Sequence, residues 1–182
     1  ILIYGAQAEA LPYATSYIPT NGAIATRLAD SVTGAGDATT FNSTEGVLYF
    51  EGAALVDGTG TRTISLSDGT NNNSITLRYT TSTGILSSFI VAGGFIQFSA
   101  NISGVSVLDF NKIAVKYKQN DFALWINGVE VATDTSGSTP SGLNELNFTR
   151  GDGANNLYGK IKSVITFDTA ITDAELECLT TI

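Results

Sequence analysis

Carboxylates are the side chains best able to do chemistry in this chain, which has 17 Asp and Glu residues and no His. A retaining glycosidase needs two carboxyl groups about 5–5.5 Å apart. Glu45 and Glu51 are six residues apart, which is too far along one strand for such a pair. Asp173, Glu175 and Glu177 alternate within a predicted helix, where that spacing splays them apart. Without His, the sequence also excludes Ser-His-Asp triads, Cys-His pairs and His-based metal sites. The residues therefore predict that the chain is not an enzyme.

The single tryptophan, Trp125, is a candidate for ligand binding. Its expected neighbours on the two adjacent strands are Lys116 and Glu130. A tryptophan on the outward face of a sheet is costly unless something covers it. Two interpretations stay open. Lys116, a loop or a neighbouring subunit covers the ring, with Lys116 contributing a cation–π contact worth about 0.5–1 kcal/mol. Alternatively, Trp125 stacks on a ligand, with Lys116 and Glu130 beside it.

A second candidate site is the polar loop Gly151 to Asn156, of sequence GDGANN. Asp152, Asn155 and Asn156 carry the oxygen atoms that calcium prefers as ligands, and Asp57 and Asp68 lie in similar loops. The same residue types also make turns without any metal. The sequence therefore leaves three possibilities. The loop forms a calcium site that includes Asp152, or it binds a ligand through Asn155 and Asn156. In the simplest case, these residues only shape turns.

Two predicted turns fix which side chains around Trp125 face the core. If residues 120–121 form a two-residue turn, Tyr117 pairs with Leu124. If the Asn-Gly pair at residues 127–128 forms the next turn, Leu124 pairs with Val131. Both turns place the same side chains on one face, which we expect to be core. That face consists of Val115, Tyr117, Leu124, Ile126, Val129 and Val131.

The rest of the chain has the profile of an all-β protein, with 43% hydrophobic residues, only 14% charged residues and 19 Gly. Short apolar stretches alternate with turn clusters, which is typical of a sandwich. Strands are predicted at residues 47–51, 62–67, 74–79, 84–91, 95–102 and 159–167, the last with a bulge. Thr172 and Glu175 then fit a capping box, so we expect a short helix that covers one end of the sandwich.

The charge of the chain limits the classes of partner it can bind, and its cysteine content limits the disulfides it can form. The net charge of −8 and a pI near 4.3 argue against nucleic acid, and no apolar run reaches the roughly 18 residues of a membrane span. Cys178 is the only cysteine, so it forms no internal disulfide, and its apolar surroundings predict a buried thiol.

Two segments carry a family resemblance. Residues 111–131, NKIAVKYKQNDFALWINGVEV, resemble the central hairpins of laminin-G-like and concanavalin A-like domains. Residues 159–179, GKIKSVITFDTAITDAELECL, resemble their last strand and terminal helix. The resemblance implies a two-sheet antiparallel jelly-roll sandwich of the concanavalin A-like kind with a short C-terminal helix.

The N-terminal region resembles a different context. Residues 4–30, YGAQAEALPYATSYIPTNGAIATRLAD, are similar to a segment of tailed-phage structural and tail-fibre proteins. The resemblance implies that residues 1–30 are the end strand of a missing upstream domain plus an extended connector, and that the sandwich spans residues 31–182. The chain contains no Met, which fits a piece of a longer protein. A virion or extracellular location follows from the same resemblance.

These observations lead to a functional expectation with an alternative. We expect a non-catalytic glycan-binding or adhesion module of a phage tail or fibre-type protein, which contacts a host-surface glycan. The alternative is a structural module that binds other copies of itself or other virion components, as a homo-oligomer. A polysaccharide-degrading enzyme of the same fold is the least favoured reading, because the carboxylate spacing and the missing His argue against it.

Overall fold

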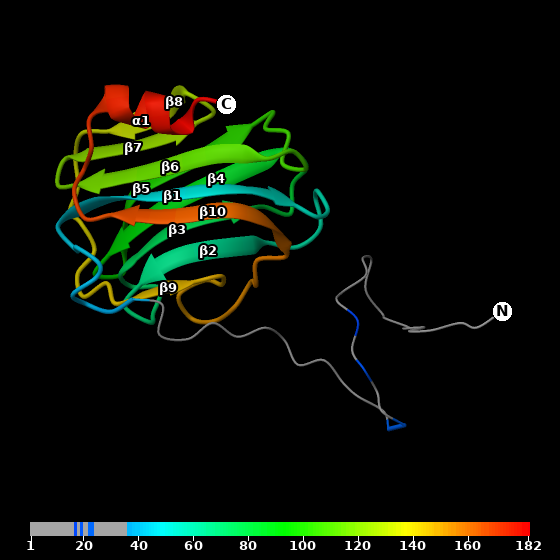
Figure 1. Cartoon of the computed structure of the whole chain (residues 1–182). Coiled ribbons are helices and arrows are strands. Elements are labelled where there is room, and N and C mark those ends of the chain that lie inside the picture. The colour runs from blue at the N-terminus through cyan, green and yellow to red at the C-terminus, as the bar shows by residue number, and fades with distance from the viewer. Residues whose placement is uncertain (1–16, 18, 20–21, 24–35) are drawn as a thin grey trace. The chain divides into compact units, whose positions relative to one another are not determined.

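The structure is a computed structural model that describes Tyr17, Pro19, Gly22, Ala23 and residues 36–182. Residues 36–182 contain two five-stranded antiparallel sheets and one helix (Figure 1). Sheet A has the order β10 (Gly159–Phe167), β1 (Glu45–Ala54), β6 (Asn111–Lys118), β7 (Asp121–Ile126) and β8 (Val129–Asp134). Sheet B has the order β5 (Phe95–Ser103), β4 (Ile85–Ala92), β3 (Ser74–Tyr79), β2 (Arg62–Ser67) and β9 (Glu145–Asn147). Helix α1 spans Asp173–Thr180. The predicted all-β sandwich with a short C-terminal helix is confirmed, whereas the expected end strand and connector at residues 1–30 lie almost wholly outside the described residues.

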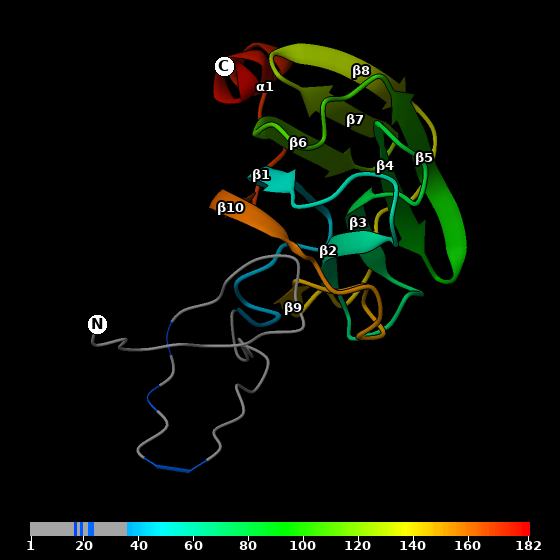
Figure 2. The ribbon, with the colours of Figure 1, turned by 90° about the vertical axis from the view of Figure 1, so that its right-hand side faces the viewer.

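The main core lies between the two sheets (Figure 2). Strand β7 shows how alternation builds it, because Phe122, Leu124 and Ile126 belong to the main core while Ala123 and Trp125 belong to a second cluster. Leu124 is 0% exposed and Ile126 is 5% exposed. Full burial of such a side chain stabilises the fold by about 1.5–3 kcal/mol. The predicted inward phase of this strand is therefore confirmed.

The first hairpin turn lies one residue earlier than predicted. Tyr117 pairs with Phe122 and Lys118 with Asp121, so the turn is formed by Gln119 and Asn120. Asn120 has a φ of 59°, a left-handed conformation that Asn tolerates better than most residues. A turn displaced by one residue shifts the strand pairing by two, so every side chain keeps its face. The predicted pairing is wrong, yet the predicted inward face survives.

The second turn is as predicted, but the strand after it departs from regular pairing. Ile126 pairs with Val129 across the Asn127-Gly128 turn. A register shift next to Trp125 then places Leu124 opposite Ala132, so the predicted pairing of Leu124 with Val131 is wrong. Val131 is partly buried against the core, whereas Val129 is 59% exposed. Val129 begins β8, the edge strand of sheet A, and its expected place in the core is wrong.

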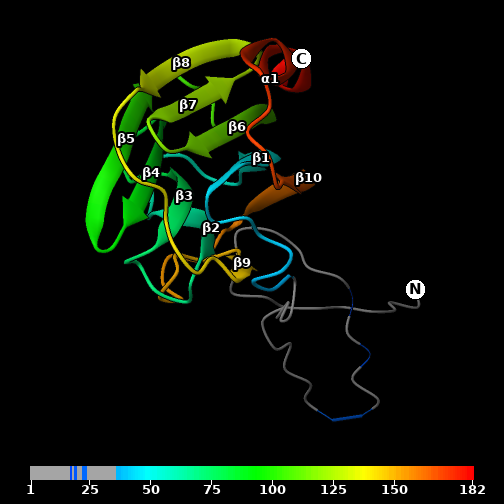
Figure 3. The ribbon, with the colours of Figure 1, turned by 90° about the vertical axis from the view of Figure 1, so that its left-hand side faces the viewer.

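Toward the end of the chain, β10 contains a bulge and β9 is an additional short strand. The predicted bulge in β10 is present, because Glu51 pairs with Ser163 while the next residue, Gly52, pairs with Ile161, which leaves Lys162 unpaired. Strand β9 was not predicted. It is three residues long and pairs with the edge of β2 (Figure 3).

Helix α1 begins with the predicted capping box. The side chain of Thr172 accepts a hydrogen bond from the backbone N–H of Glu175, and the Glu175 carboxylate accepts one from the backbone N–H of Thr172 at 2.8 Å. The sequence suggested that this helix covers one end of the sandwich, and that expectation is wrong. The helix packs on β6, β7 and β8, on the outer side of sheet A (Figure 2). Leu176, 0% exposed, packs there with Trp125, because this face carries apolar residues that need cover.

Cys178 is exposed, so the expected burial of its thiol is wrong. Helical geometry gives the reason. Leu176 and Thr180, four residues apart, are the two buried residues of α1. A residue two positions from Leu176 is rotated by about 200° around the helix, so Cys178 points to solvent.

Candidate functional site

The outer face of sheet A holds the sequence-predicted group around Trp125. Trp125 points away from the main core, as expected, and pairs with Glu130 on β8. However, it is only 6% exposed, because it packs with Leu176 of α1 and with Val47 and Ala114. Glu130 is exposed. A sugar ring has no open face of the indole to stack on in this structure.

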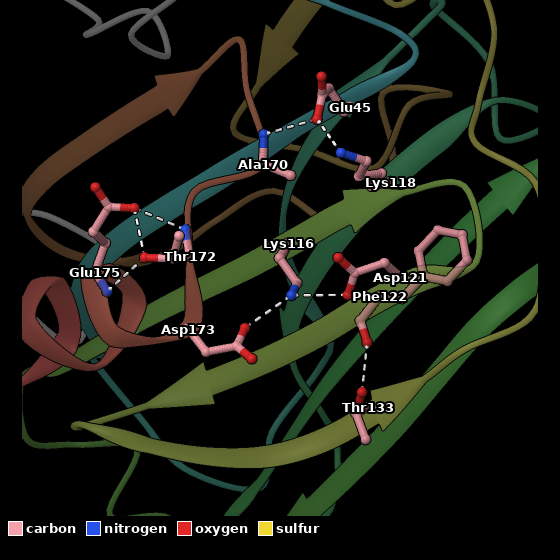
Figure 4. A network of polar contacts seen from close by, with 10 residues as sticks. All are labelled: Glu45, Lys116, Lys118, Asp121, Phe122, Thr133, Ala170, Thr172, Asp173 and Glu175. Carbon is pink, nitrogen blue, oxygen red and sulfur yellow. Dashed lines mark hydrogen bonds and ion pairs between the residues drawn. The ribbon is translucent and has the colours of Figure 1, made fainter.

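Lys116 has a structural role on the same face. Its Nζ lies 2.8 Å from Asp121 and 2.9 Å from Asp173, the first residue of α1 (Figure 4). Burial by itself lowers the pKa of the Lys116 ammonium, but the hydrogen bonds to Asp121 and Asp173 outweigh this effect and the pKa is raised. The two acids, and not the indole, bind the ammonium, since the cation–π pairs of the described residues are Arg78 with Phe89 and Lys162 with Phe110. The expected stacking of Lys116 on the ring is therefore wrong.

The outer face of sheet B is different, because small hydroxyl side chains form it. Six Ser and Thr residues alternate with the core residues of β2, β3 and β4 and are nevertheless 0–6% exposed. They are Thr63, Ser65, Ser67, Ser74, Thr76 and Ser87. Small side chains on a sheet leave room for larger groups to lie over them, and their hydroxyls offer both donors and acceptors.

Arg78 and Phe89 stand over this hydroxyl layer. Arg78 pairs with Ser87, and Thr76 with Phe89, so the arginine and the ring are diagonal neighbours on one face. The Arg78 guanidinium carbon lies 4.2 Å from the centre of the Phe89 ring. The Nε of Arg78 is buried and has no hydrogen-bond partner among the described residues. An unsatisfied buried donor costs about 1–3 kcal/mol, and more for a charged group. Of the five described side chains with a buried polar atom that has no partner, Arg78 is the charged one, which makes it the strongest candidate to meet an acceptor.

A loop brings a second arginine to the same place. Residues 148–158 follow β9, and the carbonyl of Thr149 accepts a hydrogen bond from Ser65 Oγ at 2.7 Å. Gly151 packs against the carbonyl of Thr70 so closely that a Cβ has no room. Arg150, between them, is near enough to Arg78 for its charge to act there: burial lowers the pKa of Arg78, and the charge of Arg150 lowers it further. We call Arg78, Phe89, Thr63 and Arg150 the arginine face.

Asp152 holds Arg150 in place. The Nε of Arg150 donates to Asp152 Oδ1 at 2.9 Å, and its Nη2 contacts Oδ2. Asp152 also accepts from Asn71 Nδ2 at 2.8 Å and from the backbone N–H of Ala154 at 3.1 Å. The hydrogen bonds from Arg150 and then from Asn71 hold the pKa of this carboxyl well below its usual range. The carboxylate is therefore charged at neutral pH.

Of the three loop residues predicted as ligands, two make structural contacts and the third is exposed. Asn155 has a φ of 58°, and its carbonyl accepts a hydrogen bond from the backbone N–H of Thr63 at 3.0 Å, which places the loop beside the arginine face. Asn156 is exposed. Asp152 is bound by a guanidinium, which a calcium ion would have to displace. Within residues 36–182, no three His, Cys, Asp or Glu side chains gather as a metal-binding group. Asp152 and Asn155 thus take part in the turn, and a calcium site here stays a prediction.

Three other predicted carboxylates are engaged in ion pairs or hydrogen bonds. Glu45 lies 3.1 Å from Lys118, and Glu51 lies 3.1 Å from Lys162. Asp57 accepts from the backbone N–H of Gly84 at 3.0 Å. Among the described residues, no helix is long and apolar enough to cross a membrane.

Sequence reasoning missed the arginine face. Arg78 has a signal, because it alternates with Leu77 and Tyr79 of the core and must therefore point outward from β3. Arg150 has no such signal, because it lies in a loop whose path depends on contacts with β2.

Comparison with known proteins supports the fold. No family model and no curated protein sequence matches the chain. The carbohydrate-binding module CBM40 of the Ruminococcus gnavus IT-sialidase is similar in structure, with a TM-score of 0.65 and 19% identity over 82% of this chain and 94% of that chain. The same module bound to α2,3 sialyllactose gives a TM-score of 0.65 at 20% identity, over 82% of this chain and 93% of that chain. The NanB sialidase of Streptococcus pneumoniae gives a TM-score of 0.64 at 15% identity, over 79% of this chain but only 25% of that chain. The chain thus has the β-sandwich fold of these lectin-like modules.

Proposed function

We propose that this protein is a non-catalytic carbohydrate-binding module that binds a carboxylate-bearing glycan at the arginine face. One observation carries the proposal: the Nε of Arg78 is buried, unpaired and held over Phe89, with Arg150 close by. A planar guanidinium is the side chain best suited to bind a carboxylate.

The similar structures support the choice of ligand. The CBM40 module of the Ruminococcus gnavus IT-sialidase is known bound to α2,3 and to α2,6 sialyllactose, and sialic acid carries a carboxylate. At 19–20% identity the ligand of that module is not transferred by likeness alone. It becomes a proposal here because the arginine face offers this chain's own cationic groups for a carboxylate.

The test compares two ligands that differ in the carboxylate-bearing sugar. Isothermal titration with α2,3-sialyllactose and with lactose measures how much affinity the sialic acid adds. Since a hydrogen bond to a charged group contributes about 1.5–3 kcal/mol, Arg78→Ala is expected to weaken sialyllactose binding by roughly tenfold or more. Lys118→Ala, a matched loss of a cation on sheet A, is expected to leave binding unchanged.

Two results would overturn the proposal. One is equal affinity of the wild-type protein for sialyllactose and lactose. The other is full affinity of Arg78→Ala together with a large loss in Trp125→Phe, which would return the ligand to the outer face of sheet A.

The viral setting remains a separate prediction. It rests on the resemblance of residues 4–30 to tailed-phage proteins, and the same holds for a virion or extracellular location. A structural role in assembly with other copies is the alternative function, and size determination in solution tests it, because a strict monomer counts against it.

A further inference from the structure

We propose that Asp152 tunes the charge selectivity of the arginine face, so that the site favours doubly charged phosphate monoesters over singly charged carboxylates less than two uncompensated arginines would. The inference rests on the proposed function and goes beyond it by assigning a specificity role to a residue that needs no contact with the ligand. It makes Asp152 a positioning residue that also balances charge.

The contacts of Arg150 show how this balance arises. The Nε and Nη2 of Arg150 contact the carboxylate of Asp152. The remaining nitrogen of the guanidinium, Nη1, can then donate hydrogen bonds to a ligand. Arg150 thus keeps hydrogen-bond donors for a ligand while its charge is compensated by an adjacent carboxylate. Two arginine cations and one carboxylate leave a single net positive charge at the site.

The compensation is permanent rather than switchable. Asp152 accepts from three groups, Arg150, Asn71 and Ala154, and its pKa is held well below its usual range. It therefore stays ionised at every pH at which glycans are normally bound. Its position is fixed by the loop, because Gly151 is packed against Thr70 without room for a Cβ.

Electrostatics then separates two classes of anion. A phosphate monoester carries a charge of about −1.5 to −2 at pH 7, whereas a sugar carboxylate carries −1. A fixed negative charge beside the ligand repels the phosphate up to about twice as strongly as the carboxylate. Asp152 thus lowers the affinity for both anions, but more for phosphate.

The experiment measures the ratio of two dissociation constants at pH 7.5, for N-acetylneuraminic acid and for mannose 6-phosphate. In Asp152→Asn the side chain still offers an acceptor to Arg150 but no charge. We expect the ratio to shift toward the phosphate by roughly tenfold. The matched control is Asp68→Asn, because Asp68 accepts similar turn hydrogen bonds from Thr70 and Asn73 without pairing with an arginine. Its ratio should equal that of the wild type.

A second variant keeps the test informative if Asp152→Asn disturbs the loop. In Asn71→Ala the carboxylate keeps its charge and Arg150 but loses another hydrogen bond, so selectivity should persist even if affinity falls. Binding of neither probe by the wild type would defeat the proposed function itself. Binding of the carboxylate with an unchanged ratio in a folded Asp152→Asn protein would defeat only the role given to Asp152.

Discussion

The outer faces of the two sheets differ in what they leave unsatisfied. On sheet A the ammonium of Lys116 is neutralised by two acids, and the indole of Trp125 is covered by Leu176. What this face leaves without a partner among the described residues is the uncharged Nε1 of Trp125. On sheet B the guanidinium of Arg78 has a buried donor with no partner among the described residues. A face whose apolar and charged groups are satisfied holds the fold together, whereas a face with an unpaired buried cation is prepared for a ligand. The predictions below test this division.

The largest effect is expected from the contact that covers sheet A. Leu176→Ala removes a fully buried side chain and should lower the free energy of unfolding by about 2–5 kcal/mol. Urea denaturation followed by tryptophan fluorescence measures it, since Trp125 is the only tryptophan. Glycan affinity of the folded protein should not change. A large loss of affinity without a loss of stability would contradict the division.

A smaller effect is expected at the start of α1. Thr172→Ala removes the capping box and should lower the free energy of unfolding by about 1 kcal/mol. Thr172→Ser keeps the hydroxyl and serves as the control. If thermal melting does not distinguish Ala from Ser at this position, the cap does not hold α1 on sheet A.

The ion pairs of Lys116 should give a pH-dependent contribution. Lys116→Met is expected to cost up to about 1 kcal/mol at pH 7, because both acid partners are partly exposed to solvent. The folded pKa of Lys116 is raised above its model value of 10.5. Its contribution is therefore full below that value and is lost as the pH rises through the folded pKa.

Comparing the variant with the wild type isolates this contribution. Burial raises the pKa of Tyr79 and Tyr117 as well, so both proteins should lose stability in strong base. The difference between their free energies of unfolding should shrink from pH 9 to pH 12. A difference that stays constant across this range would show that Lys116 acts through packing alone.

The smallest effect belongs to the aromatic support of the arginine face. Phe89→Leu removes the ring under Arg78 but keeps an apolar side chain, and the cation–π contact is worth about 0.5–1 kcal/mol. Sialyllactose affinity should fall by roughly two- to fivefold, and lactose binding should be unaffected. An unchanged affinity would mean that the ring does not orient Arg78.

Local patterns predicted much of the fold. The strands at residues 62–67, 74–79 and 159–167 have the predicted bounds, because alternation and turn residues are local signals. The first hairpin turn was misplaced by one residue, since Asn120 and not Asp121 takes the left-handed position. The inward face of β6 and β7 was nevertheless right, because strand parity tolerates a shift of two in pairing.

The candidate site was harder to predict. The sequence singled out Trp125 because it is rare and outward-facing, but the alternation of β7 does not say what covers it. The loop with Asp152 and Asn155 was singled out for its oxygen atoms, and it does lie beside the arginine face. Its chemistry there depends on Arg150, for which the local sequence gives no signal.

By itself, the sequence determined the sandwich, the two faces of β6 and β7 and the cap of α1, because residues close along the chain decide alternation and capping. Only the tertiary structure decided that α1 lies on sheet A and that the loop after β9 lies on β2. Arg78 and Arg150 are 72 positions apart, and nothing in their local sequence brings them together. Their meeting depends on how separate elements pack, and that packing is where the proposed binding site arises.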